Sequence, residues 1–257
     1  GGAWAPDGKS FFYCLQDENH RPSKVFHHII GQPQSSDRLV YEEKDPGFFM
    51  GVGASVLDDF IFIDIHDHET SEYRILSTKD LTAEPQIVAE REEGIEYSLC
   101  EGGDVFYILT NDGDAKDFRI CQTPVTAPGK ENWTEVVPHE PGRLILSIDA
   151  YARHLIWLER RDGLPRIVIR DRVSGEEHSV AFDEEAYSLG LHGAAEYDTN
   201  VIRFSYSSMT TPSSTYELDM DSGKRSLLKQ QPVAGFVPAQ YASERLWITA
   251  RDGVAVP

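Results

Sequence analysis

Three carboxylates stand close together in the run Tyr41-Glu42-Glu43-Lys44-Asp45-Pro46. A carboxylate can pair with the basic group of a ligand, and two of them at a fixed separation supply the acid and the base or nucleophile of a glycosidase. Nothing in the sequence sets such a separation. Glu42, Glu43 and Asp45 are therefore candidate ligand-binding residues, and a charged, solvated loop is the alternative interpretation.

A second group with possible chemistry is His66-Asp67-His68, which is followed by Glu69. Adjacent residues of a strand point to opposite faces, so only His66 and His68 could share a metal ion. No other His or Cys lies at a spacing typical of zinc ligands. We interpret the pair as part of a solvated turn, and a metal-dependent hydrolase that uses both histidines is the alternative.

Motifs of nucleophilic and phosphate chemistry are missing from the chain. Gly53-Ala54-Ser55-Val56-Leu57 lacks the closing glycine of a Gly-x-Ser-x-Gly nucleophile elbow. No Gly-x-x-x-x-Gly-Lys-Ser/Thr phosphate loop is present. We therefore predict no catalytic residue and no metal site in this chain.

The elements that must position these residues form a repeat. Equivalent places in five short apolar strands are held by Phe12, Ile61, Phe106, Leu155 and Ile202, at steps of 49, 45, 49 and 47 residues. A period of this length with four strands per unit is typical of a β-propeller. We predict an all-β fold of four-stranded antiparallel blades. The three carboxylates would then lie in a connection between blades, at one end of the propeller, where side chains can face a ligand.

Turn signals divide the chain into five units, at about 1–48, 49–93, 94–141, 142–186 and 187–235. Ser174-Gly175 and Ser222-Gly223, 48 residues apart, are expected to close hairpins between third and fourth strands. A lead-out segment runs to residue 243, and residues 244–257 contain a strand without a unit of its own. Both ends look cut, so we expect a piece of a longer protein, and a complete five-bladed ring is the alternative.

Composition limits the class of protein. The 257 residues contain no stretch of 18 apolar residues and no signal-peptide pattern at Gly1-Gly2-Ala3-Trp4. Cys14, Cys100 and Cys121 are odd in number and lie in or beside apolar strand segments, which favours buried reduced thiols over a disulfide. We therefore expect a cytoplasmic protein.

The formal net charge of −19 argues against nucleic acid and anionic membranes as partners, because Lys and Arg must neutralise phosphate there. A negative field raises the local concentration of cationic ligands, above all basic peptides, and weakens with salt. Simple solubility is the alternative explanation of the charge.

Several segments together resemble the oligopeptidase B group of the prolyl oligopeptidase family of serine peptidases. They keep the family's order along nearly the whole chain, and their combination is specific although each is weak alone. They are Lys24-Val25-Phe26-His27-His28-Ile29-Ile30-Gly31, Leu39-Val40-Tyr41-Glu42-Glu43-Lys44-Asp45, Thr70-Ser71-Glu72-Tyr73-Arg74, Glu96-Tyr97-Ser98-Leu99, Tyr206-Ser207-Ser208-Met209-Thr210-Thr211-Pro212, Pro232-Val233-Ala234-Gly235-Phe236, Leu246-Trp247-Ile248 and Ala250-Arg251-Asp252-Gly253-Val254-Ala255-Val256-Pro257.

The resemblance implies blades three to seven of a seven-bladed propeller, followed by an α/β-hydrolase domain that would begin after Arg251-Asp252-Gly253 and would hold the catalytic Ser, Asp and His. The implied parent cleaves short peptides after Arg or Lys without a cofactor, and the propeller acts as gate, size filter and substrate-steering domain. Its partners would be basic peptides and the hydrolase domain of the same chain. The free-standing alternative is a five-bladed propeller that binds a partner or acts on a carbohydrate.

For the site, the resemblance implies that the acidic loop contacts the substrate. Relatives with specificity for proline have an apolar contact at the matching loop, whereas here Glu43 stands there, with Glu42 and Asp45 beside it. Glu43 is the first candidate for contact with a basic residue. The segment from Tyr206 to Pro212 is expected to be structural or to lie between domains.

Overall fold

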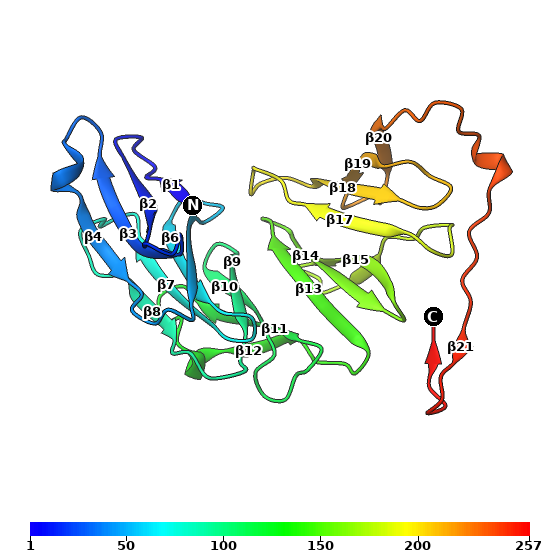
Figure 1. The fold of residues 1–257 in the computed structure, drawn as a ribbon, viewed down its shortest axis with the longest axis horizontal. Coiled ribbons are helices and arrows are strands. Elements are labelled where there is room, and N and C mark those ends of the chain that lie inside the picture. Colours follow the sequence, from blue (N-terminus) through cyan, green and yellow to red (C-terminus); the bar gives the residue numbers. More distant parts are fainter. The chain divides into compact units, whose positions relative to one another are not determined.

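The computed structural model describes residues 1–257, and the chain is built from five four-stranded sheets and one two-stranded sheet. Within each four-stranded sheet, consecutive strands pair in antiparallel fashion as a simple meander. The predicted all-β fold of four-stranded antiparallel repeats is confirmed (Figure 1). No helix has the length and apolar character that a membrane-spanning helix needs.

The chain divides into two compact units, and the first, Gly1–Pro138, holds three sheets. The first sheet consists of β1 (Gly2–Trp4), β2 (Ser10–Gln16), β3 (Pro22–Ile29) and β4 (Arg38–Glu42), with the short 3-10 helix Gln34–Ser36 before β4. The second consists of β5 (Phe49–Ala54), β6 (Phe60–His66), β7 (Ser71–Ser77) and β8 (Gln86–Ala89). The third consists of β9 (Tyr97–Glu101), β10 (Val105–Thr110), β11 (Arg119–Pro124) and β12 (Thr134–Val137), with the 3-10 helix Lys130–Asn132 before β12.

The second unit, His139–Pro257, holds two four-stranded sheets and the C-terminal segment. One sheet consists of β13 (Arg143–Ala150), β14 (His154–Arg161), β15 (Leu164–Asp171) and β16 (Glu177–Ser179). The other consists of β17 (Ser188–His192), β18 (Val201–Ser207), β19 (Ser214–Asp219) and β20 (Arg225–Gln230). A 3-10 helix, Pro238–Gln240, and the two-strand ribbon of β21 (Ile248–Thr249) and β22 (Ala255–Val256) follow.

Neighbouring sheets of one unit are held together by apolar side chains at alternate strand positions. One core lies between the first two sheets, where Phe12 and Ile61 are fully buried, and a second includes Phe106 of the third sheet. In the second unit, Ile202 and Phe204 of β18 pack with Ile156 and other residues of the preceding sheet. Burial of each such side chain stabilises the fold by roughly 1.5–3 kcal/mol, which explains why the apolar positions repeat with the blade.

Turn residues close the hairpins where the sequence predicts them. Gly175 and Gly223 have φ angles of 75° and 69°, in the left-handed region that a side chain disfavours. Each donates its N–H to the last residue of the preceding strand, Asp171 or Asp219. The strand predicted within residues 244–250 is shorter in the structure, because only Ile248 and Thr249 pair, with Val256 and Ala255.

Candidate functional site

The acidic loop begins where β4 ends. Val40 is buried, Tyr41 is half-buried, Glu42 is exposed and Glu43 is buried again, at 6% exposure. The Glu43 N–H donates to the Ser23 carbonyl at 2.9 Å, so the chain stays extended beside β3 for one residue past β4. Glu42 and Glu43 point to different sides as a result.

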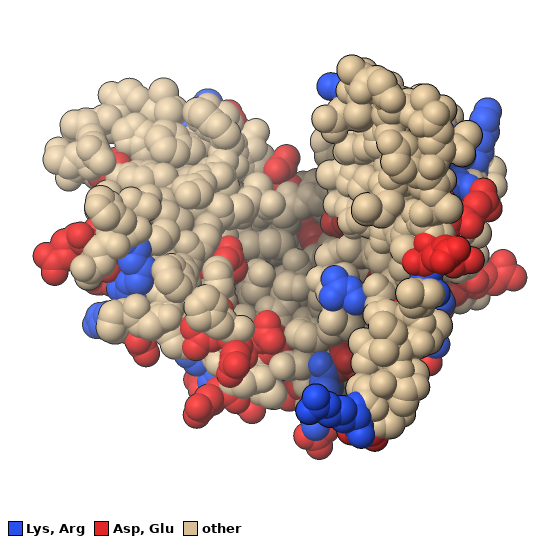
Figure 2. Space-filling view, turned by 45° about the vertical axis from the view of Figure 1, so that its right-hand side comes forward, with Lys and Arg blue, Asp and Glu red and all other residues tan.

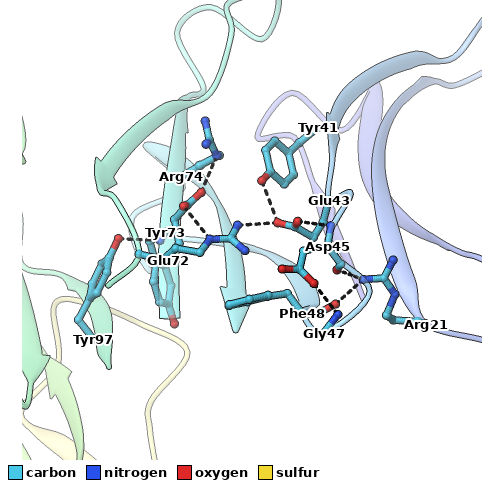
Figure 3. A network of polar contacts seen from close by, with 11 residues as sticks. Arg21, Tyr41, Glu43, Asp45, Gly47, Phe48, Glu72, Tyr73, Arg74 and Tyr97 are labelled. Carbon is cyan, nitrogen blue, oxygen red and sulfur yellow. Dashed lines mark hydrogen bonds and ion pairs between the residues drawn. The ribbon is translucent and has the colours of Figure 1, made fainter. Parts of the chain in front are cut away.

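The Glu43 carboxylate is bound by groups of its own chain. It accepts hydrogen bonds from the Arg91 guanidinium at 2.6 Å, from the Asp45 N–H at 2.8 Å and from the Tyr41 hydroxyl at 3.1 Å (Figure 3). Burial acts to raise the pKa of Glu43, but these three donors outweigh it and hold the pKa below its usual value. The carboxylate is consequently ionised and bound by three donors in this structure.

Arg91 carries the network from the first blade connection to the next. Its Nε donates to the second buried carboxylate, Glu72, at 3.2 Å, and its guanidinium carbon lies 4.1 Å from the centre of the Phe48 ring. Arg74 binds the other oxygen of Glu72 at 3.0 Å and lies over the Tyr41 ring at 4.7 Å. Two arginines thus balance two buried glutamates, as Figure 3 shows for Glu43, Glu72 and Arg74.

The other two acidic candidates have separate surroundings. The Asp45 carboxylate accepts the Gly47 N–H at 2.8 Å, while the Asp45 carbonyl accepts from Arg21, which also donates to the Phe48 carbonyl. Glu42 forms an ion pair of 3.2 Å with Lys24, and both side chains are more than a third exposed. Of the three candidates, Glu42 and Asp45 are the ones that water reaches.

Sequence analysis did not identify Arg91, Glu72 and Arg74 as part of this site. Arg91 follows Glu43 by 48 residues, which is one repeat of the propeller. It therefore occupies the next blade connection, as Glu43 occupies the previous one. A basic residue one repeat after an acidic residue was the feature of the sequence that could have identified this pair.

The segment from Tyr206 to Pro212 forms a second organised site, around a residue that sequence analysis also missed. Hydroxyl groups of Tyr206, Ser208, Thr210 and Thr211 all donate to the carboxylate of Glu184. Burial acts to raise the pKa of Glu184, but the hydroxyl donors outweigh it and lower the pKa. A turn between β18 and β19 is thereby fixed to the connection that precedes β17.

The two candidate histidines of the run from His66 to Glu69 have different local surroundings. His66 ends β6 and lies 3.3 Å from Asp64, whereas His68 lies in the following turn. No group of three or more His, Cys, Asp or Glu side chains is placed to hold a metal ion. No disulfide joins Cys14, Cys100 and Cys121.

Acidic side chains are widely distributed. On the face drawn in Figure 2, Asp and Glu lie scattered over both units instead of forming one patch. On this face, the net charge of −19 therefore produces a diffuse negative field and no single acidic binding surface.

Comparisons with known proteins agree with this architecture. Residues 1–231 match the family model of the prolyl oligopeptidase N-terminal β-propeller domain. Dipeptidyl aminopeptidase BI of Pseudoxanthomonas mexicana is 37% identical over 254 residues, which cover 97% of this chain and 34% of that protein. Protease 2 of Moraxella lacunata is 32% identical over 256 residues, which cover 99% of this chain and 36% of that protein.

Among solved structures, oligopeptidase B from Trypanosoma brucei, in its closed form with covalently bound antipain, is 32% identical with a TM-score of 0.92. The match covers 99% of this chain and 38% of that one. The chain therefore spans little more than a third of the length of these relatives. Since the family model covers nearly all of the five sheets, the chain belongs to the prolyl oligopeptidase family and forms its N-terminal β-propeller domain.

Proposed function

We propose that this chain is the non-catalytic propeller of a serine oligopeptidase that cleaves short peptides after Arg or Lys. The observation that carries the proposal is the match of 99% of the chain to oligopeptidase B, of which it covers only 38%. The remaining length of such a relative leaves room for an α/β-hydrolase domain in the same polypeptide, and this domain is the propeller's proposed partner.

In the proposed parent, a serine of the hydrolase domain attacks the peptide carbonyl, and water then hydrolyses the acyl-enzyme. This reaction uses side chains and backbone donors, so no cofactor is required. The propeller restricts entry to short peptides, and opening between the two domains admits them. We place the protein in the cytoplasm, in keeping with its three thiols and no disulfide.

One face of the first sheet carries exposed apolar side chains, which suits a neighbouring blade in the proposed ring. Trp4, Leu15 and Leu39 are 60%, 43% and 44% exposed, although they alternate with residues of the buried core. A sheet of a propeller normally buries both faces against its neighbours. A further blade of the same polypeptide is the proposed cover.

The preference for basic residues rests on charge. The negative field attracts cationic peptides, and Glu42, Glu43 and Asp45 remain the predicted contacts in the propeller. In the present geometry a basic substrate side chain would compete with the exposed Lys24 for Glu42 and with the more buried Arg91 for Glu43, whereas the exposed Asp45 carboxylate has no basic partner.

A second candidate reaction rests on the relative that is 37% identical, which is named a dipeptidyl aminopeptidase. Such an enzyme releases dipeptides from a free N-terminus. Cleavage of peptides with a blocked N-terminus distinguishes the two candidates, because only an endo-acting oligopeptidase accepts them.

The test uses the full-length protein with fluorogenic peptides that carry Arg, Lys, Pro or Ala before the scissile bond, and a fluorophosphonate probe. We expect labelling of one serine outside residues 1–257, faster cleavage after Arg and Lys, and a KM for basic peptides that rises with salt. Labelling within residues 1–257 would overturn the domain assignment. Equal cleavage rates for all four peptides would overturn the proposed preference for Arg and Lys.

A further inference from the structure

Two arginines of the second unit have no acidic partner, although the chain carries 43 acidic residues. Arg166 lies in β15, and Arg245 lies in the C-terminal segment shortly before β21. Neither guanidinium group lies within ion-pair distance of a carboxylate or donates a hydrogen bond to another group of the chain. Their positive charges are therefore not compensated by the protein.

The acidic residue opposite Arg166 is bound by other groups. Arg166 pairs across the sheet with Glu159 of β14. The buried Glu159 carboxylate accepts the Trp157 indole N–H at 2.9 Å and lies 4.0 Å from Nε of Arg161. Arg166 consequently gains no ion pair from its own sheet.

Arg245 lies against the turn that joins β14 to β15. A Cβ atom at Gly163, in this turn, would lie 3.7 Å from Nη2 of Arg245, and the guanidinium carbon lies 4.6 Å from the centre of the Trp247 ring. The backbone N–H of Arg245, and not its guanidinium group, donates to the Glu185 carboxylate at 3.1 Å. Nη2 is buried and has no hydrogen-bond partner. A buried charged donor without an acceptor is costly, so an anion at this guanidinium group would stabilise the segment.

Both arginines lie near the hydroxyl group of Tyr187, in the connection before β17. Burial raises the pKa of Tyr187, and the positive charges of Arg166 and Arg245 act against this rise. The Tyr187 hydroxyl forms no hydrogen bond within the chain. Ser243, two residues before Arg245, also has a buried hydroxyl group without a partner. Three separate segments thus bring donors to one region of the second unit and supply no acceptor for them.

We propose that Arg166, Tyr187 and Arg245 bind a small oxyanion with two negative charges, of the class of inorganic phosphate. Planar guanidinium groups bind phosphate oxygens through paired N–H donors, and the Tyr187 hydroxyl adds a further donor. The two guanidinium charges balance the two charges of the ion. All three side chains belong to half-buried residues, so the ion reaches them from solvent.

The bound ion would also fix the C-terminal segment in place. Arg245 belongs to that segment, whereas Arg166 belongs to the hairpin of β14 and β15. An ion that binds both arginines therefore joins the segment to the hairpin. This inference does not depend on the proposed peptidase reaction.

Isothermal titration calorimetry of the full-length protein with inorganic phosphate tests the binding. The titration is made at about pH 8, where a phosphate group carries two charges, and at constant ionic strength. We expect one saturable site with a Kd on the order of 1 mM or lower. The net charge of −19 repels anions from most of the surface, so saturable binding reports a local site.

Variants assign the binding to the three residues. Arg166→Gln and Arg245→Gln should each weaken phosphate binding about tenfold, and Tyr187→Phe about threefold. Neither arginine replacement leaves a carboxylate without its partner, so the fold should be preserved. Arg160→Gln, at an exposed residue of the same hairpin, removes the same charge and is the matched control without effect.

Hydrogen exchange tests the link between the two segments. At a phosphate concentration about ten times the Kd, amides of residues 243–249 should exchange about tenfold more slowly, because only the docked segment binds the ion. In Arg166→Gln the same concentration should give only about twofold protection, although this residue lies outside the segment.

Three results would overturn the proposal. Absence of saturable binding at about 10 mM phosphate would show that another part of the full-length protein supplies the counter-charge. Binding that neither arginine variant weakens, or that Arg160→Gln weakens equally, would place the ion elsewhere. Binding without protection of residues 243–249 would show that the ion does not join the segment to the hairpin.

Discussion

Replacement of Arg91 by Met should separate the first two blade connections from each other. Arg91 joins Glu43, which follows β4, to Glu72 in β7. Methionine keeps much of the side-chain length and its contact with Phe48 but removes the charge. Two carboxylates at 6% and 5% side-chain exposure would then lack their shared cation.

The structure gives the size of this effect. Removal of one partner from a buried ion pair costs roughly 3–5 kcal/mol. Since the Arg91 side chain is 25% exposed, water partly solvates the freed carboxylates, and the lower end applies, about 3 kcal/mol. Glu43→Gln removes one charge-assisted hydrogen bond and should cost about 1.5 kcal/mol. The double variant should cost about 2.5 kcal/mol, because the neutral amide at position 43 no longer needs the cation, and the coupling is then about 2 kcal/mol.

Hydrogen exchange measured by mass spectrometry reports these local openings in the full-length protein. Amides of residues 41–50 and 86–97 should exchange about 150-fold faster in Arg91→Met, and the coupling corresponds to about 30-fold. Arg203→Met is the control. Its ion pair with Glu217 is 3.0 Å long but its side chain is 61% exposed, so a change below about 1 kcal/mol is expected.

Additive effects would refute this reasoning. If Glu43→Gln and Arg91→Met combined with a coupling below about 0.5 kcal/mol, the 2.6 Å contact would have no energetic role. Glu43 would then be available to a substrate, and the kinetic constants of Glu43→Gln for basic peptides would measure that role. If the coupling is strong, the kinetic constants of Glu43→Gln must be compared with those of Arg91→Met before a direct contact between Glu43 and the substrate is assigned.

Three other residues offer independent tests. Burial raises the pKa of Asp149 to about 6 from a usual 3.8, so the folded state holds this proton more tightly and stability falls as pH rises from about 4 to about 6. Asp149→Asn should remove this slope and stabilise the protein above pH 6 by up to about 3 kcal/mol, measured by urea unfolding across that range; an unchanged slope would contradict it. Glu184→Gln should speed amide exchange in residues 206–212, because four hydroxyl groups lose an anionic acceptor at a cost of roughly 1–3 kcal/mol. Unaltered exchange there would show that Glu184 does not hold this turn in place. Phe204→Ala, at a fully buried position, should cost about 3–5 kcal/mol in the same urea assay, whereas a cost below about 1 kcal/mol would show that the site collapses without a cavity.

The repeat could be predicted because it depends on local rules. Phe12, Ile61 and Phe106 lie at the centres of short apolar strands that recur at a nearly constant spacing, and such runs between turn residues can be found from the chain alone. Gly175 and Gly223 mark hairpins because few other residues accept a positive φ angle. These signals need no knowledge of distant contacts.

The candidate site could be located but not understood in this way. The run of Glu42, Glu43 and Asp45 was visible in the sequence, but the strand pattern does not show that Glu43 is the buried one, because Val40 and Glu43 lie three residues apart. Its partners could not be deduced, because Arg91 lies 48 residues away and reaches Glu43 only when two sheets pack together. Glu184 was missed for the same reason, since its four hydroxyl donors lie 22–27 residues further along the chain.

The sequence by itself determined the fold class, the blade period and the negative field, because side-chain alternation, turn residues and charge are additive along the chain. Only the tertiary structure decided which charged side chains are bound by other groups of the chain and which remain accessible to a ligand. Arg91 binds Glu43 and four hydroxyl groups of a later segment bind Glu184, whereas Glu42 and Asp45 stay exposed to solvent. Pairing depends on distances of a few ångströms between segments that are remote in sequence, and only packing of the sheets sets those distances.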